Sequence, residues 1–287
     1  MPPILLKNRI LRLLFTGTFL FFTLWFLFQA LWHRQMYREN CYGSDRFDFR
    51  IYGKINDPKI NESSGLVLEK DSLFWTHNDD TDSSLYLISS RGNLKSKWSI
   101  PFKNRDWEEV CKDEAGNLYV GDFGNNFELN RKLKIHKIMP EERKILGGIE
   151  FDYVDEKGEI EQHDCEAMVH WGDSLYLFTK SKTERLSIVY AISDKPGKYT
   201  IREKQRLPVY GVVTAAALKP DGKELALLTY GKIYFYSLPN FLSGQIPASD
   251  FCFAYWNMRQ SESICYWKPD SLLLGNEQGN LYLMIRK

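Results

Sequence analysis

The chain lacks an excess of charge of either sign. Its 287 residues include 38 Lys and Arg against 37 Asp and Glu, a formal net charge of +1. Without an excess, no long-range field draws the molecule to a nucleic acid or to an anionic surface. We therefore expect no nucleic-acid partner, and a charged ligand must be met by a local cluster of side chains.

Several motifs of metal and nucleophile chemistry are also missing. The five cysteines are odd in number, and no two have the spacing of a zinc knuckle or a thioredoxin-like site. Cys111, Cys165 and Cys265 lie in short apolar runs, which favours buried free thiols over disulfides. No Ser-His-Asp or nucleophile-elbow spacing occurs, so hydrolysis through a covalent nucleophile is not supported.

One long apolar run does stand near the N-terminus. Residues 13–32 carry no charge, which matches a membrane-spanning helix, and basic residues precede them. We predict a cytoplasmic flank at 1–12, a single-pass anchor at 13–32 and a linker at 33–46, in the inner (plasma) membrane. The rest of the chain would face the periplasm or the extracellular space. A cleaved signal peptide is the competing interpretation, although no small-residue cleavage site follows the run.

From about residue 47 the chain repeats itself with a period near 48 residues. The copies begin at Asn61, Trp107, Cys165, Val213 and Ser261. In each copy, two further runs of β-branched and aromatic residues follow after turns rich in Gly, Asp, Asn and Ser. Such runs are typical of antiparallel strands in a meander.

Four antiparallel strands per copy predict the blades of a β-propeller. A β-sandwich is the alternative, but it would need no common register between copies. The last copy has only three strands, and residues 47–53 can supply its outer strand. The sequence thus predicts an all-β domain over residues 47–287, a propeller of about five four-stranded blades. A sixth blade stays open if the longer second copy conceals one.

Acidic residues gather on one face of this predicted propeller. The loops that enter the inner strands carry Glu62, Glu108, Glu166 and Glu262, while Thr214 takes this place in the fourth copy. Crowded carboxylates must be relieved by protonation, by basic side chains or by a cation. Because oxygen ligands suit Ca²⁺, we predict these four glutamates as metal ligands. A structural alternative stays open, in which each glutamate caps backbone N–H groups of a neighbouring blade.

The loops that follow the second strands emerge on the same face and add candidates for ligand binding. These are His77, Asn78, Asp79, Asp122, Asn125, Lys180 and Glu277. Lys180 suits a phosphate or a carboxylate. His77 suits a base, although a single histidine near a loop is more often a hydrogen-bonding residue.

Four segments carry a family resemblance: 75–79 (WTHND), 106–109 (DWEE), 119–126 (YVGDFGNN) and 166–168 (EAM). With them the chain resembles a group of poorly characterised bacterial extracytoplasmic propellers that share a WTHND, DWED and YxGDxGDN pattern. That group is loosely similar to calcium-dependent β-propeller phytases and to lactonase-like propellers. The resemblance implies a propeller fold and an extracytoplasmic location.

Three functions remain open at this point. The leading one is a membrane-anchored binding or assembly module that presents its Glu-rich face to an envelope protein, a peptide or a glycan. The alternative is a calcium-dependent hydrolase, a phosphoesterase or lactonase-like enzyme, in which Ca²⁺ polarises the substrate. A structural subunit of a membrane complex is the third. The sequence leaves open whether the protein is an enzyme.

Overall fold

The chain divides into two compact units, residues 1–40 and 41–287. The computed structural model describes residues 18, 20–25, 27, 46–126, 132–181, 185–245, 251–254, 258 and 260–287. The predicted flank at 1–12 and most of the predicted anchor (13–32) and linker (33–46) lie outside these residues. Within the part that is described, no helix is long and apolar enough to cross a membrane.

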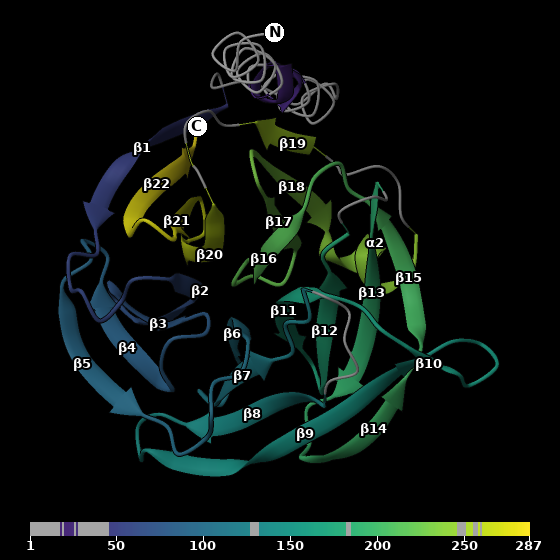
Figure 1. Ribbon diagram of the computed structural model, residues 1–287. Helices are drawn as coiled ribbons and strands as arrows, with labels where there is room; N and C mark the ends of the chain where they lie inside the picture. Colours follow the sequence, from purple (N-terminus) through teal and green to yellow (C-terminus); the bar gives the residue numbers. More distant parts are fainter. Residues whose placement is uncertain are drawn as a thin grey trace, which may run out of the picture. The chain divides into compact units, whose positions relative to one another are not determined.

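The second unit consists of five sheets, which we number as blades 1 to 5 (Figure 1). Blade 1 contains β2 (Ser63–Lys70), β3 (Leu73–Asn78), β4 (Ser84–Ser89) and β5 (Leu94–Ser99). Blade 2 contains β6 (Trp107–Lys112), β7 (Leu118–Asp122), β8 (Leu133–Met139), β9 (Lys144–Val154) and β10 (Ile160–Glu161). Blade 3 contains β11 (Cys165–Trp171), β12 (Ser174–Thr179), β13 (Leu186–Ser193) and β15 (Glu203–Pro208).

The last two blades follow the same order from the inside outward. Blade 4 contains β16 (Val213–Leu218), β17 (Glu224–Thr229), β18 (Lys232–Ser237) and β19 (Phe251–Ala254), with the short helix α2 (Leu238–Leu242) after β18. Blade 5 contains β20 (Ser261–Lys268), β21 (Ser271–Asn276), β22 (Asn280–Arg286) and β1 (Phe47–Lys54). The inner strands β2, β6, β11, β16 and β20 each contact the inner strands of two neighbouring blades, which closes the ring (Figure 1). The predicted five-bladed propeller is confirmed.

The longer second copy does not conceal a sixth blade. Its extra residues lengthen β9 and add the short β10. From blade 3, β14 (Gly197–Ile201) also joins this sheet and pairs in parallel with β9. Blade 2 is therefore widened at its outer edge, where the prediction had four strands.

The N-terminal end of the propeller closes the ring, as predicted. β1 pairs antiparallel with β22, so that Phe47 lies opposite Arg286 and Phe49 opposite Met284. Phe47 is 1% exposed and stacks on Phe235 of blade 4 with ring centroids 5.8 Å apart. β1 therefore supplies the fourth, outer strand of blade 5 and pairs with the outer side of β22.

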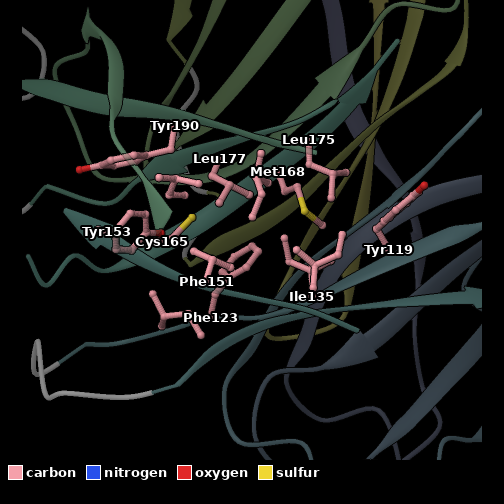
Figure 2. Packing of buried hydrophobic residues seen from close by; sticks show 14 of the residues in the cluster. Tyr119, Phe123, Ile135, Phe151, Tyr153, Cys165, Met168, Leu175, Leu177 and Tyr190 are labelled. Carbon is pink, nitrogen blue, oxygen red and sulfur yellow. The ribbon is translucent and has the colours of Figure 1, made fainter. Parts of the chain in front are cut away.

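The core consists of apolar clusters between adjacent blades. Figure 2 shows the cluster between blades 2 and 3, where Ile135 and Phe151 face Met168 and Leu177. Burial of this apolar area is the main term that holds the blades together. Cys111, Cys165 and Cys265 are buried free thiols, as predicted, while Cys41 and the side chain of Cys252 lie outside the described residues.

Candidate functional site

A β-bulge near the start of the inner strand sets one side chain apart in blades 2 to 5. The pairing of β6 with β7 skips Glu108 and leaves it as the extra residue. The same skip occurs at Glu166 in β11, Thr214 in β16 and Glu262 in β20. A bulge re-aims its side chain. The three glutamates line one cavity of about 220 Å³, which we call the acidic mouth.

Blade 1 departs from the alignment that the sequence suggested. β2 begins at Ser63, and its pairing with the end of β3 puts Ser64, not Glu62, at the position of Glu108. The predicted equivalence of Glu62 with the other glutamates is therefore wrong by two residues. Glu62 lies in the loop before β2, yet its side chain still lines the acidic mouth.

A second set of side chains completes the acidic mouth. These residues directly follow the second strand of a blade, and they are Asp79, Lys180, Tyr230 and Glu277. The whole lining is Glu62, Ser64, Asp79, Glu108, Asn126, Glu166, Lys180, Tyr230, Glu262 and Glu277. Two positions of the repeat, the bulge in the inner strand and the residue after the second strand, therefore supply most of the residues that line the cavity. The lining contains six carboxyl groups and one ammonium group.

Of the predicted site residues, the four glutamates, Asp79, Lys180 and Glu277 all meet at this cavity. The prediction missed Tyr230 and Asp106. Tyr230 carried a usable signal, because it follows the second strand of its copy as Lys180 does in blade 3. Asp106 stands two residues before Glu108, as Asp164 does before Glu166, so the repeat also marked it.

The other predicted ligand residues lie beside the acidic mouth and brace its loops. Asn78 donates to the Lys59 carbonyl oxygen at 2.7 Å. Asp122 accepts from the backbone N–H of Asp106 at 3.2 Å and forms an ion pair with Arg105 at 3.0 Å. The backbone N–H of Asn125 donates to Asp164 Oδ1 at 2.9 Å, which ties the loops of blades 2 and 3.

His77, the predicted base, is fully buried between blades 1 and 2. Its Nδ1 lies 3.0 Å from the carbonyl oxygen of Asn78, and its ring meets Trp107 edge to face. Burial lowers the pKa of His77 to about 4, so the ring is neutral at physiological pH. A neutral ring in this packed position fits the hydrogen-bonding alternative better than a catalytic base.

Two groups of carboxylates in or beside the acidic mouth have the spacing of cation ligands. One oxygen each of Glu108, Asp164 and Glu166 lie within 4.8 Å of one another, and all three residues are buried. Asp79, Asp106 and Glu108 form a second group with the same spacing. Oxygens that share a Ca²⁺ ion at about 2.3–2.6 Å are separated by no more than about twice that length. Glu108 belongs to both groups.

The bulge glutamates are not backbone caps. Glu108 Oε1 is buried, and no residue in the described part of the chain forms a hydrogen bond with it. Glu166 Oε1 accepts from Lys180 Nζ at 2.8 Å, and Glu262 accepts from the Tyr230 hydroxyl group. Among the described residues, it is the neighbouring Glu109 that meets the structural alternative. It accepts from the backbone N–H groups of Val110 and of Ala216 in blade 4, each at 3.0 Å.

Crowding and burial raise the pKa values of the carboxyl groups in the acidic mouth. Burial, followed by the charges of Glu166 and Asp79, raises the pKa of Glu108 well above its ordinary value. Burial likewise raises the pKa of Glu166 to about 8 and that of Glu262 to about 7, although Lys180 lowers both. Burial also raises the pKa of Asp79 to about 7, with help from Asp106. Such carboxyls have protons to exchange for a cation.

Gly124 lets the two backbones of blade 2 approach at this point. Its backbone N–H donates to the Asp106 carbonyl oxygen at 3.2 Å. A Cβ atom here would collide with Glu108 Oε1 and lie 2.6 Å from Asp106 Cγ. The glycine in the GDFGNN segment is therefore needed for close packing against the carboxylates.

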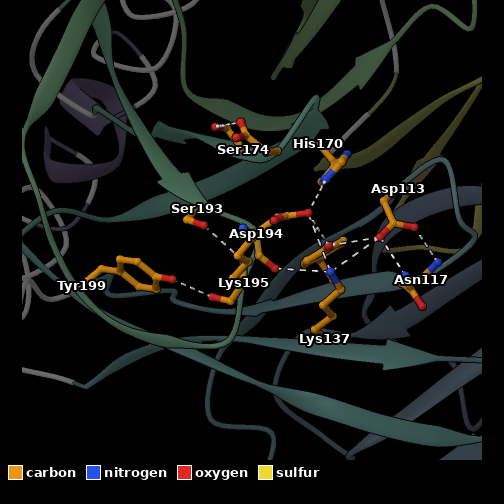
Figure 3. Close-up of polar contacts among 11 residues, drawn as sticks. Asp113, Asn117, Lys137, His170, Ser174, Ser193, Asp194, Lys195 and Tyr199 are labelled. Carbon is orange, nitrogen blue, oxygen red and sulfur yellow. Dashed lines mark hydrogen bonds and ion pairs between the residues drawn. The ribbon is translucent and has the colours of Figure 1, made fainter.

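A third carboxylate group, at the other ends of blades 2 and 3, is satisfied by the protein itself (Figure 3). Asp113, His170 and Asp194 have the spacing of metal ligands. However, Lys137 Nζ lies 3.8 Å from Asp113 Oδ2 and 3.7 Å from Asp194 Oδ2. The Tyr119 hydroxyl group donates to both carboxylates, at 3.1 and 3.2 Å. This network links two blades and needs no added cation.

The propeller channel also holds an apolar cavity of about 390 Å³. Each blade contributes inner-strand residues to its wall, among them Val67, Val110, Val169, Ala216 and Ile264. Glu109 bonds the N–H groups of two residues in this wall, those of Val110 and Ala216. The two cavities therefore differ in chemistry. Among the described residues that line them, the buried carboxylate oxygens without a hydrogen-bond partner are those of Glu62, Asp79 and Glu108, in the acidic mouth.

No family model and no curated protein matches the chain. By structure it is similar to virginiamycin B lyase from Staphylococcus aureus, with a TM-score of 0.39 and 12% identity over 82% of this chain and 69% of that one. A streptogramin B lyase gives a TM-score of 0.43 and 11% identity, with 84% and 98% covered. A protein of unknown function from Bacteroides thetaiotaomicron gives 0.48 and 12%, with 84% and 76% covered. Likenesses of this size carry no argument about function, and the resemblance to extracytoplasmic propellers stays a prediction.

Proposed function

We propose that this protein is a binding module whose acidic mouth holds Ca²⁺ and, through it, a ligand. The propeller fold supports a binding or assembly module in general. The observation that carries the finer proposal is Glu108. Its Oε1 is buried and has no hydrogen-bond partner in the described part of the chain, and one carboxylate oxygen of Glu108 lies within 4.8 Å of one oxygen each of Asp164 and Glu166. A carboxylate oxygen that is buried and unpaired is costly unless something binds it.

The chemistry of the lining favours calcium over other cations. The acidic mouth presents carboxyl, amide and hydroxyl oxygens, and its lining, as far as the chain is described, contains no histidine or cysteine. Ca²⁺ accepts six to eight oxygens in irregular geometry, whereas zinc prefers nitrogen and sulfur in a tetrahedral site. A set of oxygen ligands contributed by all five blades is therefore a calcium type of site.

The size of the cavity supports a ligand beyond the ion. Water occupies about 30 Å³ per molecule in the liquid, so a cavity of about 220 Å³ has room for an ion and several waters or a ligand group. An envelope protein, a peptide or a glycan can offer such an oxygen-bearing group. The membrane anchor at residues 13–32 and the extracytoplasmic location remain part of this proposal.

A calcium-dependent hydrolase is the second candidate, and the protonation of the mouth favours it. Glu262 and Asp79, whose pKa values burial raises to about 7, can exchange protons near neutral pH. Groups of that kind serve as general acids or bases when a cation polarises a phosphate or an ester. Turnover of such substrates only in the presence of calcium would favour this candidate over a pure binding module.

The proposal is tested by thermal unfolding of the full chain with calcium and with chelator. A cation that binds only the folded state stabilises it by RT ln(1 + [L]/Kd), about 2.7 kcal/mol at a hundredfold excess over Kd. We expect Tm to rise with calcium, and the rise to be lost in Glu108→Gln. Glu156→Gln, an exposed carboxylate on blade 2, is the matched control and should keep it. A Tm that ignores both calcium and chelator would refute the proposal.

A further inference from the structure

Lys180 is a cation that the protein itself places inside the acidic mouth. Among the described residues that line this cavity, it is the one basic side chain. Its backbone N–H donates to the Asp164 carbonyl oxygen at 2.8 Å, and its Nζ lies 2.8 Å from Glu166 Oε1. The side chains of Lys180 and Glu166 are 11% and 3% exposed. The ion pair is therefore largely withdrawn from water.

The ammonium group of Lys180 acts on the mouth as a whole. Besides Glu166, its charge lowers the pKa values of Glu108, Glu262, Asp79 and Glu277. Burial lowers the pKa of Lys180, but Glu166 and Glu262 raise it by more, so the amine stays charged. The group also faces the Tyr230 ring, 6.0 Å from its centroid. Lys180 thus neutralises part of the charge of five carboxyl groups.

This position conflicts with a bound divalent cation. Glu166 belongs to the carboxylate group that also contains Glu108 and Asp164, and its Oε1 is engaged by Lys180. A dication held by that group would repel an ammonium group bonded to the same carboxylate, in a cavity where water screens little. Each of the two positive groups therefore weakens the binding of the other to Glu166.

We propose that Lys180 is a tethered competitor that sets both the affinity and the cation selectivity of the acidic mouth, an inference that rests on the proposed function. Because the amine is tethered, its effective concentration is of millimolar order or higher. A monovalent ion brings the same single charge and gains nothing by displacing it. A divalent ion brings twice the charge, so it can expel the amine from Glu166.

The first test is calorimetric titration of the full chain with calcium. Lys180→Met removes the competitor and should bind calcium at least about tenfold more tightly, a difference of about 1.4 kcal/mol. Lys180→Arg keeps the competing charge and should stay near the wild type. Lys204→Met, an exposed lysine on β15, is the matched control for the loss of one positive charge and should not change Kd. Circular dichroism and metal-free Tm verify that each variant is folded.

The second test asks whether the amine leaves and whether it excludes monovalent ions. Acetylation of Lys180, followed by mass spectrometry, should accelerate on addition of calcium. When choline in the buffer is replaced by sodium at constant ionic strength, calcium binding by Lys180→Met should weaken. Calcium binding by the wild type should not change.

The outcomes separate the two proposals. If the wild type binds calcium but Lys180→Met binds equally or more weakly, the competitor is refuted while the calcium site stands. Acetylation of Lys180 that slows with calcium, or a sodium effect equal in both proteins, would refute the competitor as well. If neither protein binds calcium, the proposed function fails first. Binding by Lys180→Met alone would support the competitor.

Discussion

At the scale of single residues, Glu108 and Glu109 are neighbours with opposite roles. Glu108 presents an unpaired buried oxygen to the acidic mouth, whereas Glu109 binds backbone N–H groups of blades 2 and 4. The sequence alone does not show which of the two glutamates has which role. The difference arises from the bulge in β6, which turns Glu108 out of the regular alternation of the strand.

We predict opposite effects of the two Gln substitutions on the metal-free protein. Glu109→Gln places an NH₂ group against a backbone N–H group and leaves a buried donor unpaired, so it should cost about 2–3 kcal/mol. Glu108→Gln relieves repulsion and should leave stability unchanged or raise it. Urea denaturation in the presence of chelator measures both. A larger loss for Glu108→Gln would mean that Glu108 is the structural residue.

The raised pKa values predict how the metal-free protein responds to pH. Burial moves the pKa of Glu166 from 4.5 to about 8 and that of Glu262 from 4.5 to about 7, so the folded state binds more protons than the unfolded state in this interval. The stability that comes from this extra proton binding is fully present below the pKa of the unfolded state. It is lost as pH rises through the pKa of the folded state. Metal-free Tm should therefore fall between about pH 5 and 8.

Calcium should weaken that trend, since it replaces the protons of the carboxyl groups in the acidic mouth. Calcium affinity should rise over the same pH range, and the fall in Tm should shrink when calcium is present. Differential scanning calorimetry at several pH values checks both. A Tm that climbs with pH in chelator would contradict the protonation of the mouth.

The sequence predicted most of the residues that line the acidic mouth, but not which side chains pair with one another. The repeated Glu and the polar loops indicated Glu108, Glu166, Glu262 and Asp79, because the repeat places equivalent side chains on one face. It misaligned Glu62, since a shared Glu letter says nothing about where a strand begins. Side-chain partners were also out of reach. That Lys180 lies among carboxylates depends on distances between blades, which no single repeat encodes.

At the scale of elements, we expect loss of β1, the strand that closes the ring, to reduce the stability of the propeller most. β1 is buried at its start and exposed in its middle, with Phe47 1% and Ile51 68% exposed. Phe47→Ala should cost about 3–5 kcal/mol, the usual range for a core phenylalanine. Ile51→Ala, on the same strand, should stay within about 0.5 kcal/mol. Equal effects in thermal unfolding would mean that β1 does not seal the ring as described.

The strands that the sequence predicted are those whose apolar alternation is internal to one copy. Residues 47–53 were recognised because the last copy had only three strands. The widening of blade 2 was not, since β14 pairs in parallel with β9 of another blade and this depends on the tertiary fold. Bulges were missed for a similar reason, because they are defined by a partner strand.

At the scale of the whole molecule, closure of the ring brings polar side chains from all five blades into one cavity. Each blade contributes one to three residues to the acidic mouth, and both carboxylate groups there with the spacing of cation ligands combine residues of two blades. Closure by β1 therefore matters to binding as well as to stability. The carboxylates that repel one another are held close by apolar packing between the blades, and a bound cation would offset that repulsion.

The most direct test is a crystal structure of the full chain grown with calcium, with its anomalous signal recorded. The account predicts a calcium ion between the carboxylates of Glu108, Asp164 and Glu166, with Lys180 Nζ displaced from Glu166. The contrary result is a mouth without calcium at a saturating concentration, in which a protein group donates a hydrogen bond to Glu108 Oε1.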